Sequence, residues 1–456
     1  MKKVVIIGGG AAGPKAAAKL SRLNKNIEID LYTQEEIVSY SACGLPFYVE
    51  GLISDIDSLI IRTVDEFKEQ GVNVHLSSKC TKINPDEKTV EILNLQTNDK
   101  ILIPYDELVI ATGARPFIPP IINSELNNIF TLKTLNDGVK IREKMRISQK
   151  AVIVGGGNIS IELLWAFTKN DINTEIVECS SHMLRKLDTE MAQLVERYIL
   201  GNFENSIKIH TNKYAVEFIS DDNQNVIAVK LNTGEVIETD FVVIASGIVP
   251  NSEIFKEAGG ILSVSDTIKV DTYMQTNLKD VYACGDVVAN YNIISHKPDW
   301  IPLASTANKE GRIVALNINE MKEAFYGVLS SVVTKFHNLT IASCGLNEFE
   351  AQENGFTPVS AMVTKKDKAG YMPDAKEITL KLVADYYSQK ILGAQAIGPG
   401  DVHKRMGTVV VCIMSDFRVH DLLHLDLPYA PPYSPTIDPL LTVAQIISQK
   451  IYNIYK

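Results

Sequence analysis

One cysteine in this sequence stands where a thiol could do redox chemistry. Cys43 is followed by Gly44 and Pro46, an order that predicts a turn leading into a helix or bend. At a helix N-terminus the dipole and the free N–H groups lower a thiol pKa, so we expect Cys43 to be a thiolate at neutral pH. The next cysteine is Cys80, so a redox partner of Cys43 would be a small-molecule thiol or oxygen. The simpler alternative is a buried structural cysteine.

A glycine-rich loop precedes this cysteine. Gly8, Gly10 and Gly13 have the spacing G-x-G-x-x-G directly after an apolar, β-branched run. In this context the glycines allow a tight turn and the close approach of a pyrophosphate to a helix N-terminus. The second strand of such a unit should end in an acid that binds a ribose hydroxyl. Thr33 stands there instead, and a threonine hydroxyl can make the same contact.

The same pattern returns in the middle of the chain. Gly155 and Gly157 begin the second loop, and Ser160 replaces the third glycine. The strand after this loop ends in Glu178. A carboxylate at this point accepts hydrogen bonds from a ribose 2′-hydroxyl and repels a 2′-phosphate, so NADH is favoured over NADPH.

Basic residues follow both loops. Arg185 and Lys186 lie beyond the second unit and keep NADPH possible. In the first unit, Lys15, Lys19 and Arg22 have the i, i+4, i+7 spacing of one helix face. This face is either an ordinary solvated surface or a phosphate-binding face that points towards Cys43.

The elements that must position these residues alternate between strands and helices. Apolar runs closing in Ala111-Thr112-Gly113 and in Ser246-Gly247 indicate chain crossovers beside a nucleotide, or only strand-to-loop turns. Asp286 closes a further strand, and the family resemblance described below implies that it binds a flavin ribityl hydroxyl. The predicted strands span 4–7, 27–32, 151–154, 175–178, 332–336, 378–383 and 391–396, and the predicted helices span 16–23, 161–167, 303–314, 347–354, 403–415 and 442–452.

Composition restricts the class of protein. The chain has 456 residues, enough for two or three domains, and a net charge of −10, which argues against a general nucleic-acid binder. Its 6 cysteines form no disulfide framework and no C-x-x-C metal pair. The first residues enter a strand directly, and no apolar run approaches the length of a membrane span. We therefore expect a cytoplasmic enzyme, with no metal and no membrane partner.

Together these motifs resemble the pyridine nucleotide-disulfide oxidoreductases over essentially the whole chain. The resemblance implies an α/β fold of two dinucleotide-binding, Rossmann-like domains and a C-terminal α+β dimerisation domain. It implies an FAD-binding domain at 1–115 and 250–322, an NAD(P)H-binding domain at 116–249, and a dimerisation domain at 323–456. The chain would then act as a homodimer with active sites shared between its subunits.

Within that family the single cysteine is similar to one branch. Two-cysteine members have C-x4-C, but Tyr48 occupies the position of the second cysteine. The single-cysteine branch includes coenzyme A-disulfide reductases, coenzyme A-persulfide reductases, NADH oxidases and NADH peroxidases. The peroxidases and oxidases carry a histidine in the first glycine loop, where this chain has Ala11 and Ala12. The coenzyme A reductases use two tyrosines of the partner subunit, and Tyr371 and Tyr429 match those positions, although either could be a surface residue.

The motifs and the resemblance assign the remaining site residues. The expected cofactor contacts are Gly8, Gly10, Ala12, Gly13, Thr33, Ala111, Thr112, Gly113, Arg115, Asp286, Ala304, Gly155, Gly157, Asn158, Ile159, Glu178 and Gly247. The expected coenzyme A contacts are Lys15, Lys19, Arg22, Ser39, Asn308 and Lys309. Ala42 departs from the asparagine that the reductases commonly have, so one polar contact to the substrate is missing.

The resulting hypothesis is an FAD-dependent NAD(P)H:disulfide oxidoreductase. Electrons pass from NADH through FAD to a mixed disulfide between Cys43 and coenzyme A, and the substrate is coenzyme A disulfide, a persulfide or a polysulfide. Tyr429, and secondarily Tyr371, would donate protons or hydrogen bonds to the leaving thiolate. The alternatives are an NADH oxidase that reduces oxygen at the flavin, and a redox-sensing flavoprotein that does not turn over a small acceptor.

Overall fold

The computed structural model describes residues 1–454, so the last two residues of the expected C-terminal domain lie outside the described part. The N-terminal sheet has five parallel strands in the order β18-β7-β1-β2-β3. The apolar run at 4–7 lies within a strand, β1, as predicted, and its side chains are buried. The strands are β1 (Lys2–Ile7), β2 (Ile27–Tyr32), β3 (Val72–His75), β7 (Glu107–Ile110) and β18 (Val281–Ala283).

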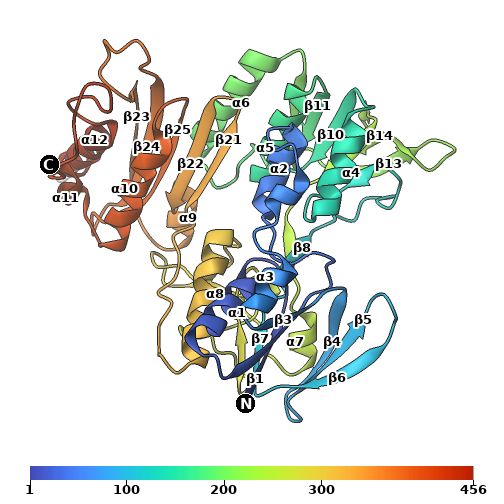
Figure 1. Ribbon diagram of the computed structural model, residues 1–456. Coiled ribbons are helices and arrows are strands. Elements are labelled where there is room, and N and C mark those ends of the chain that lie inside the picture. Colours follow the sequence, from blue (N-terminus) through green and yellow to red (C-terminus); the bar gives the residue numbers. More distant parts are fainter. Residues whose placement is uncertain (455–456) are drawn as a thin grey trace.

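A second parallel sheet of five strands follows, in the order β12-β11-β10-β16-β9. Figure 1 shows it at the upper right, above the first sheet. Its strands are β9 (Ile129–Phe130), β10 (Lys150–Val154), β11 (Asn173–Val177), β12 (Ile207–His210) and β16 (Phe241–Ile244).

The register of the two sheets brings the predicted loops together. In the first sheet Ile7 pairs with Tyr32 and with Ile110, so the residues after all three strands lie together at the carboxyl end of the sheet. In the second sheet Val154 pairs with Val177 of the strand on one side and with Ile244 of the strand on the other side. Ligands of open parallel sheets bind outside the carboxyl ends of the strands, so the dinucleotide sites are expected at the carboxyl ends of these two sheets.

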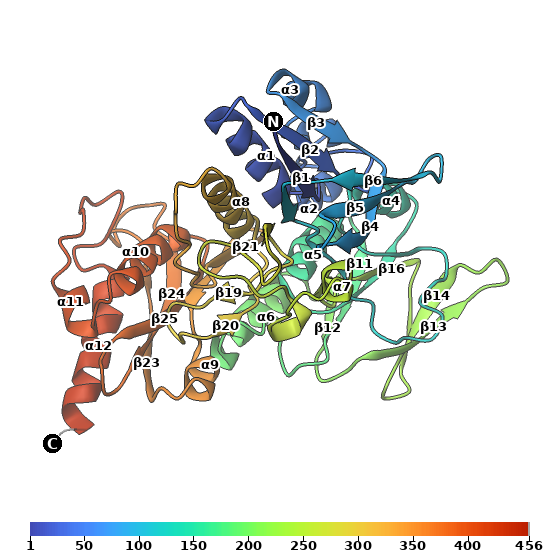
Figure 2. The same ribbon diagram turned by 90° about the horizontal axis from the view of Figure 1, so that it is seen from below.

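The C-terminal part is built on an antiparallel sheet in the order β21-β22-β25-β24-β23. Figure 2 shows this sheet and its helices on one side of both parallel sheets. Its strands are β21 (Val332–Phe336), β22 (Leu339–Gly345), β23 (Pro358–Lys366), β24 (Glu377–Asp385) and β25 (Ile391–Gly398). The predicted fold class is thereby confirmed.

Several strands have no counterpart in the sequence prediction. In the C-terminal sheet β22 and β23 were missed, because β22 contains small residues with low strand propensity and β23 is a half-exposed edge strand with a polar end. Smaller sheets were also missed. They consist of β4 (Ser78–Asn84), β5 (Thr89–Asn94) and β6 (Lys100–Pro104); of β13 (Ala215–Ser220), β14 (Val226–Leu231) and β15 (Val236–Glu238); of β8 (Ala114–Pro116) and β17 (Ile248–Pro250); and of β19 (Asn290–Tyr291) and β20 (Pro298–Asp299).

Helices cover the sheets, and the short helix after Cys43 has an unexpected place. In Figure 1 α2 lies beside α4 and α5 of the second unit, although its sequence belongs to the first. None of the helices within residues 1–454 combines the length and the apolar character of a membrane span. The helices are α1 (Ala12–Leu23), α2 (Leu45–Glu50), α3 (Val64–Glu69), α4 (Leu135–Met145), α5 (Asn158–Lys169), α6 (Thr189–Phe203), α7 (Glu253–Glu257), α8 (Ala304–Ile318), α9 (Glu348–Glu353), α10 (Val402–Met414), α11 (Val419–Leu423) and α12 (Pro439–Ile454).

Candidate active site

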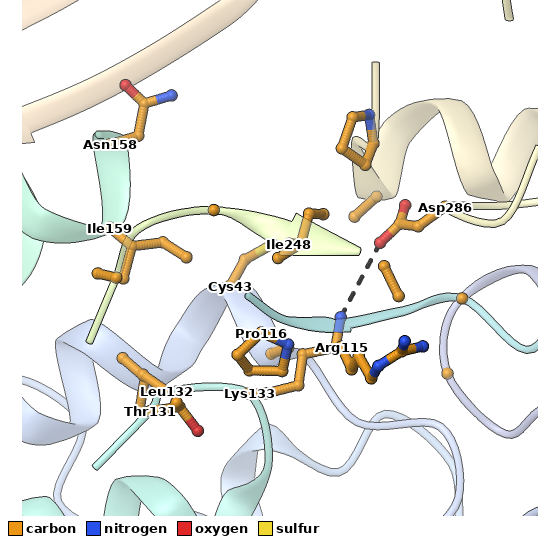
Figure 3. A pocket seen from close by; sticks show the side chains of 18 of the residues that line it. Cys43, Arg115, Pro116, Thr131, Leu132, Lys133, Asn158, Ile159, Ile248 and Asp286 are labelled. Atoms are coloured by element: carbon orange, nitrogen blue, oxygen red, sulfur yellow. Dashed lines mark ion pairs between the residues drawn. The ribbon is translucent and has the colours of Figure 1, made fainter. Parts of the chain in front are cut away.

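One large cavity, with a volume of about 2480 Å³, runs along the carboxyl ends of both parallel sheets. Pockets for a single drug-sized ligand have about 300–1,000 Å³, so this cavity has room for more than one large ligand. All the expected cofactor residues except Gly13 line it. Figure 3 shows Cys43 on its wall, with Asn158 and Ile159 on one side and Asp286 and Lys133 on the other.

Three helices point uncapped N-termini at this cavity. No side chain within residues 1–454 caps α1, α5 or α8, and their first turns contain no acid. By contrast, α3, α4 and α9 have complete capping boxes, begun by Thr63, Thr134 and Asn347. Free N–H groups and the helix dipole attract anions, so the uncapped ends are suited to phosphate groups.

The glycines of the first loop have two different jobs. A Cβ on Gly8 would lie 1.9 Å from the Ala111 carbonyl oxygen, and one on Gly13 would lie 2.0 Å from the Gly8 oxygen, so these two permit close packing. Gly10 and Gly113 would place a Cβ in space that is open to 4 Å. Gly113, beyond the first loop, has a φ of +64°, a conformation that favours glycine, and the open space at Gly10 leaves room for a ligand to approach the backbone.

The second loop is built in the same way, but its acid is already engaged. A Cβ on Gly155 would lie 2.5 Å from the Ala245 oxygen, whereas Gly157 faces open space. Glu178 is 6% exposed and accepts hydrogen bonds from the backbone N–H groups of Gly156 (2.6 Å) and Ser180 (2.7 Å). Oε1 also accepts from the Cys179 thiol (3.4 Å), whereas Oε2 keeps a second lone pair, so Glu178 can hold the loop and still accept a ribose hydroxyl.

The first unit has no equivalent of this acid. Thr33 is buried at the end of β2, and its hydroxyl accepts only the Glu35 N–H (3.3 Å) among the hydrogen bonds of residues 1–454. Glu35 also lines the cavity and accepts from the Tyr40 hydroxyl (2.9 Å). Burial raises the pKa of Glu35, an effect that the Tyr40 hydrogen bond opposes.

Cys43 is an exposed free thiol in a short 3₁₀ turn, Ala42–Gly44, directly before α2. It therefore is not the buried structural cysteine of the simpler alternative. The predicted lowering of its pKa is wrong, because desolvation first, and then the carboxylates of Glu162 and Asp286, raise that pKa. Solvent reaches the thiol, but protein surrounds it on the cavity wall, and α2 with six residues is too short to offset this.

Two residues beside the thiol escaped the sequence analysis. Lys133 lowers the pKa of Cys43, and its Nζ lies 3.9 Å from the Asp286 carboxylate (Figure 3). Glu162 lies on α5, accepts a hydrogen bond from Thr334 (2.9 Å), and has a pKa raised by burial. An acid inside the otherwise apolar helix 161–167 is a signal that could have identified Glu162.

The predicted basic face divides into cavity-lining and outer residues. Lys15, Arg22, Ser39 and Asn308 line the cavity, together with Arg62, which the sequence analysis missed. The backbone N–H of Arg62 lies 3.4 Å from the Ser39 oxygen, and its guanidinium lies 5.0 Å from the Phe67 ring centroid. Within residues 1–454 the cations of Lys15, Arg22 and Arg62 form no ion pair. The described cavity lining does not include the expected contacts Lys19 and Lys309.

The two candidate tyrosines lie on the C-terminal part, outside the described lining of the cavity. Tyr371 is 76% exposed and Tyr429 is 50% exposed. Their loops meet, because the Ala369 N–H donates to the Pro431 oxygen (3.2 Å).

These residues fit the cofactors that the motifs imply. The open glycines and the uncapped N-terminus of α1 suit the pyrophosphate of FAD, and Asp286 and Ala304 at the cavity wall suit its ribityl chain. The N-terminus of α5 and Glu178 offer the same features to NAD(P)H.

Comparison with known proteins agrees with this geometry. A family model described as pyridine nucleotide-disulphide oxidoreductase matches residues 2–311, and the dimerisation domain of the same family matches 331–440. The chain is 33% identical to the NAD(P)H coenzyme A polysulfide/persulfide reductase of Pyrococcus horikoshii, over 98% of each chain. It is 30% identical to an NADH oxidase of Methanocaldococcus jannaschii, over 99% of this chain and 100% of the other. The solved structure of an NAD-dependent persulfide reductase from A. fulgidus has a TM-score of 0.95 and 34% identity, and covers 99% of this chain and 84% of that one.

Proposed function

Because the chain belongs to the pyridine nucleotide-disulphide oxidoreductase family, we propose that it reduces coenzyme A disulfide or a coenzyme A persulfide through Cys43. The family sets the coarser activity, a flavin-dependent NAD(P)H:disulfide oxidoreductase. The observation that carries the finer proposal is the position of the exposed Cys43 thiol in one cavity with Lys15, Arg22 and Arg62. These cations are suited to the phosphates of coenzyme A, because no ion pair within residues 1–454 neutralises them.

Cys43 is the nucleophile in this scheme. Its thiolate attacks one sulfur of the coenzyme A disulfide, the S–S bond breaks, and one coenzyme A leaves as a thiolate that takes up a proton. The other half stays on Cys43 as a mixed disulfide. With a persulfide as substrate, attack on the sulfur that bears coenzyme A releases hydrosulfide instead and gives the same mixed disulfide.

Two electrons must then break the mixed disulfide. When bound, FAD would supply this chemistry, because it can take up a hydride from NAD(P)H and deliver two electrons to a disulfide. The products are the Cys43 thiolate and a second coenzyme A thiol, so one NAD(P)H and one proton convert one disulfide into two thiols. Gly10 and Asp286 would hold the flavin, and Glu178 would hold the nicotinamide dinucleotide.

The protein must also form the Cys43 thiolate against a raised pKa. Lys133 supplies the nearby positive charge that favours the thiolate. Coenzyme A phosphates would bind to Lys15, Arg22 and Arg62 in the cavity lining. This binding would bring the disulfide to the Cys43 thiol. Tyr371 and Tyr429 would act in a homodimer, where the partner subunit brings them to the leaving thiolate.

Mass spectrometry of the purified protein under non-reducing conditions tests this proposal first. We expect a coenzyme A adduct on Cys43 that dithiothreitol removes, and we expect Cys43→Ser to abolish NADH-dependent disulfide reduction. A Cys43→Ser enzyme with full disulfide reductase activity would refute the scheme.

Two residues of α1 test whether the cavity-lining cations bind the coenzyme A phosphates. Arg22 lines the cavity and Lys19 does not, although both lie on the same helix. We expect Arg22→Gln to raise the KM for coenzyme A disulfide about fivefold to tenfold, because a charge-assisted contact is lost. Lys19→Gln should have the smaller effect, and the reverse order would contradict this assignment.

The second candidate function is an NADH oxidase, favoured by the similarity to the M. jannaschii protein. Ala11 and Ala12 occupy the first glycine loop, so no histidine stands there for oxygen chemistry. Oxygen uptake with NADH, measured beside disulfide reduction, separates the two. A Cys43 sulfenic acid without any adduct, and oxygen uptake well above the disulfide reduction rate, would support the oxidase.

A further inference from the structure

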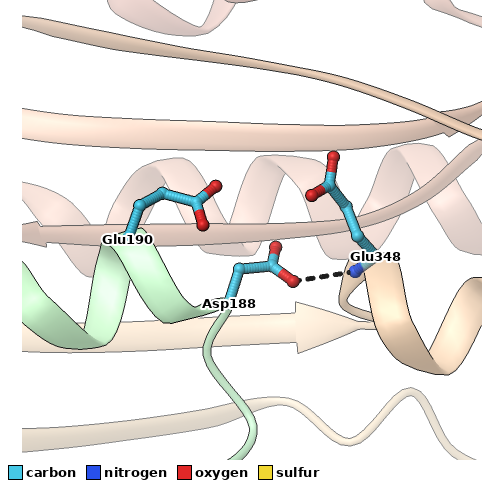
Figure 4. Close-up of side chains that lie close together, drawn as sticks. All are labelled: Asp188, Glu190 and Glu348. Carbon is cyan, nitrogen blue, oxygen red and sulfur yellow. Dashed lines mark hydrogen bonds between the residues drawn. The ribbon is translucent and has the colours of Figure 1, made fainter. Parts of the chain in front are cut away.

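Three carboxylates converge outside the cavity, where the second parallel sheet meets the C-terminal sheet. Figure 4 shows Asp188 and Glu190 at the start of α6 facing Glu348 at the start of α9. Their cation is a lysine of the same chain, because the Lys381 ammonium lies 2.7 Å from Asp188 and 3.0 Å from Glu348 and also bonds Glu190. Lys381 is 1% exposed and Asp188 is also buried, whereas Glu348 is half-buried and Glu190 is exposed. The cluster is therefore an interdomain contact with a buried centre, and its lysine takes the place that a metal ion would need.

Asp188 carries most of this contact. Gln395 of β25 donates to its carboxylate (2.6 Å) and accepts from its backbone N–H (2.8 Å). The backbone N–H of Glu348 donates to its other oxygen (3.0 Å). A buried carboxylate with a cation and two further donors is fully satisfied, so Asp188 is held firmly against the C-terminal sheet.

Asp188 also ends a loop that lines the proposed nicotinamide site. This loop comprises residues 184–188 and is called the 184–188 loop below. Four of its residues, Leu184 to Leu187, line the cavity. At its other end the Leu184 N–H donates to the Gly156 oxygen (2.8 Å), within the second glycine loop. The 184–188 loop therefore connects the glycine loop directly to the C-terminal sheet.

Helix α9 holds the middle of the same loop. The Asn347 side-chain amide lies 3.5 Å and 3.4 Å from the carbonyl oxygens of Arg185 and Lys186. Lys186 forms an ion pair with Glu350. Since Asn347 and Glu350 make the capping box of α9, the helix start itself is the support for the loop.

We propose that Asp188 and Lys381 are positioning residues, through which the C-terminal domain holds the 184–188 loop in the shape that binds the nicotinamide dinucleotide. This rests on the assignment of the second glycine loop to NAD(P)H. The contact affects binding of that cofactor and leaves the Cys43 chemistry unchanged, because no residue of the cluster lines the cavity beside the thiol.

The test is anaerobic reduction of the flavin by NADH in the holoenzyme, followed in a stopped-flow spectrometer over a range of NADH concentrations. Asp188→Asn keeps the shape of the side chain and leaves Lys381 with two carboxylates. We expect the Kd for NADH to rise about fivefold, with the limiting rate of reduction changed by less than about twofold. A role confined to stability would lower the unfolding temperature without moving this Kd.

Two further variants keep the test decisive. Glu350→Gln retains the capping box, which glutamine also completes, but removes the ion pair with Lys186, so the Kd should rise about twofold to threefold. Asp385→Asn is the matched control, because Asp385 is also a buried acid on β24 and accepts from Thr357 and Ser388, away from the 184–188 loop. It should leave the Kd for NADH unchanged.

An unchanged Kd in both Asp188→Asn and Glu350→Gln would overturn the proposal. An equal rise in Asp385→Asn would do the same, because the effect would then be a general one of the C-terminal domain. Failure of the coenzyme A assignment would instead appear as a missing adduct on Cys43, with NADH reduction of the flavin intact.

Discussion

The two glycine loops of this protein have the same topology but different chemistry behind them. In each loop the second of three consecutive glycines, Gly9 or Gly156, packs against the residue that follows the next strand. A Cβ on Gly9 would lie 2.7 Å from the Thr33 hydroxyl oxygen, and one on Gly156 would lie 2.9 Å from a Glu178 carboxylate oxygen. Only the second loop uses this approach for a hydrogen bond, from Gly156 N–H to Glu178.

The third position of the motif differs in the opposite sense. A Cβ on Gly13 would lie 2.0 Å from the Gly8 oxygen, whereas Ser160 is accommodated at the same point of the second loop. The first loop is therefore held by close backbone packing at both Gly8 and Gly13, whereas the second combines such packing at Gly155 with a buried carboxylate. Two units of one fold can thus fix a phosphate-binding turn by different physical means.

Gly13→Ala should have the largest effect, because it removes the close packing that holds the first loop. The new Cβ would meet backbone, which cannot rotate away, so α1 must shift. We expect loss of most of the bound flavin and a fall in the free energy of unfolding of about 3 kcal/mol. The flavin-to-protein absorbance ratio and urea unfolding measure the two effects.

Ser160→Ala is the matched variant in the second loop. The Ser160 hydroxyl is buried and has no hydrogen-bond partner within residues 1–454. Its removal should change stability by no more than about 1 kcal/mol, and in the stabilising direction. Equal damage from Gly13→Ala and Ser160→Ala would show that the two loops do not differ in packing.

Glu178→Gln should have the next largest effect, because the second loop depends on the carboxylate. In the native protein the Gly156 and Ser180 N–H groups each donate to a different oxygen of Glu178. A glutamine has only one acceptor oxygen, so one of these N–H groups loses its partner. That loss costs about 1–3 kcal/mol, and we expect the KM for NADH to rise about tenfold. Steady-state kinetics at saturating disulfide measures this, and an unchanged KM would mean that the loop is held by its other contacts.

The sequence predicted what short-range patterns encode. The strand-glycine-helix order identified both loops, and the missing acid at Thr33 and the third-position serine were visible as departures. The pKa of Cys43 was predicted in the wrong direction because the burial that raises it first, and the carboxylates of Glu162 and Asp286 that raise it next, depend on segments distant in the sequence. The position of α2 on α5 could not be predicted, because a six-residue helix has too short a pattern to specify its partner.

Cys43 lies where the two units meet, so its acidity reports on both. Lys133 lowers its pKa and Glu162 raises it. Removing the positive charge in Lys133→Met should raise the thiol pKa further, which leaves less thiolate and slows alkylation by iodoacetamide about threefold at pH 8. Glu162→Gln should act in the opposite direction. Alkylation rates measured against pH test both signs, and parallel shifts in the two variants would contradict this electrostatic account.

Thr33→Val should have a small effect, and it tests the first loop at a single hydrogen bond. Valine keeps the shape against Gly9 and loses only a hydroxyl that accepts one N–H at 3.3 Å. A neutral hydrogen bond contributes about 1 kcal/mol, roughly half of a charge-assisted one, so flavin affinity should fall by no more than about fivefold. Fluorescence of released flavin during dilution measures this. A loss of flavin comparable with that of Gly13→Ala would mean that Thr33 replaces the missing acid as the ribose contact, and the two units would then share one means of binding after all.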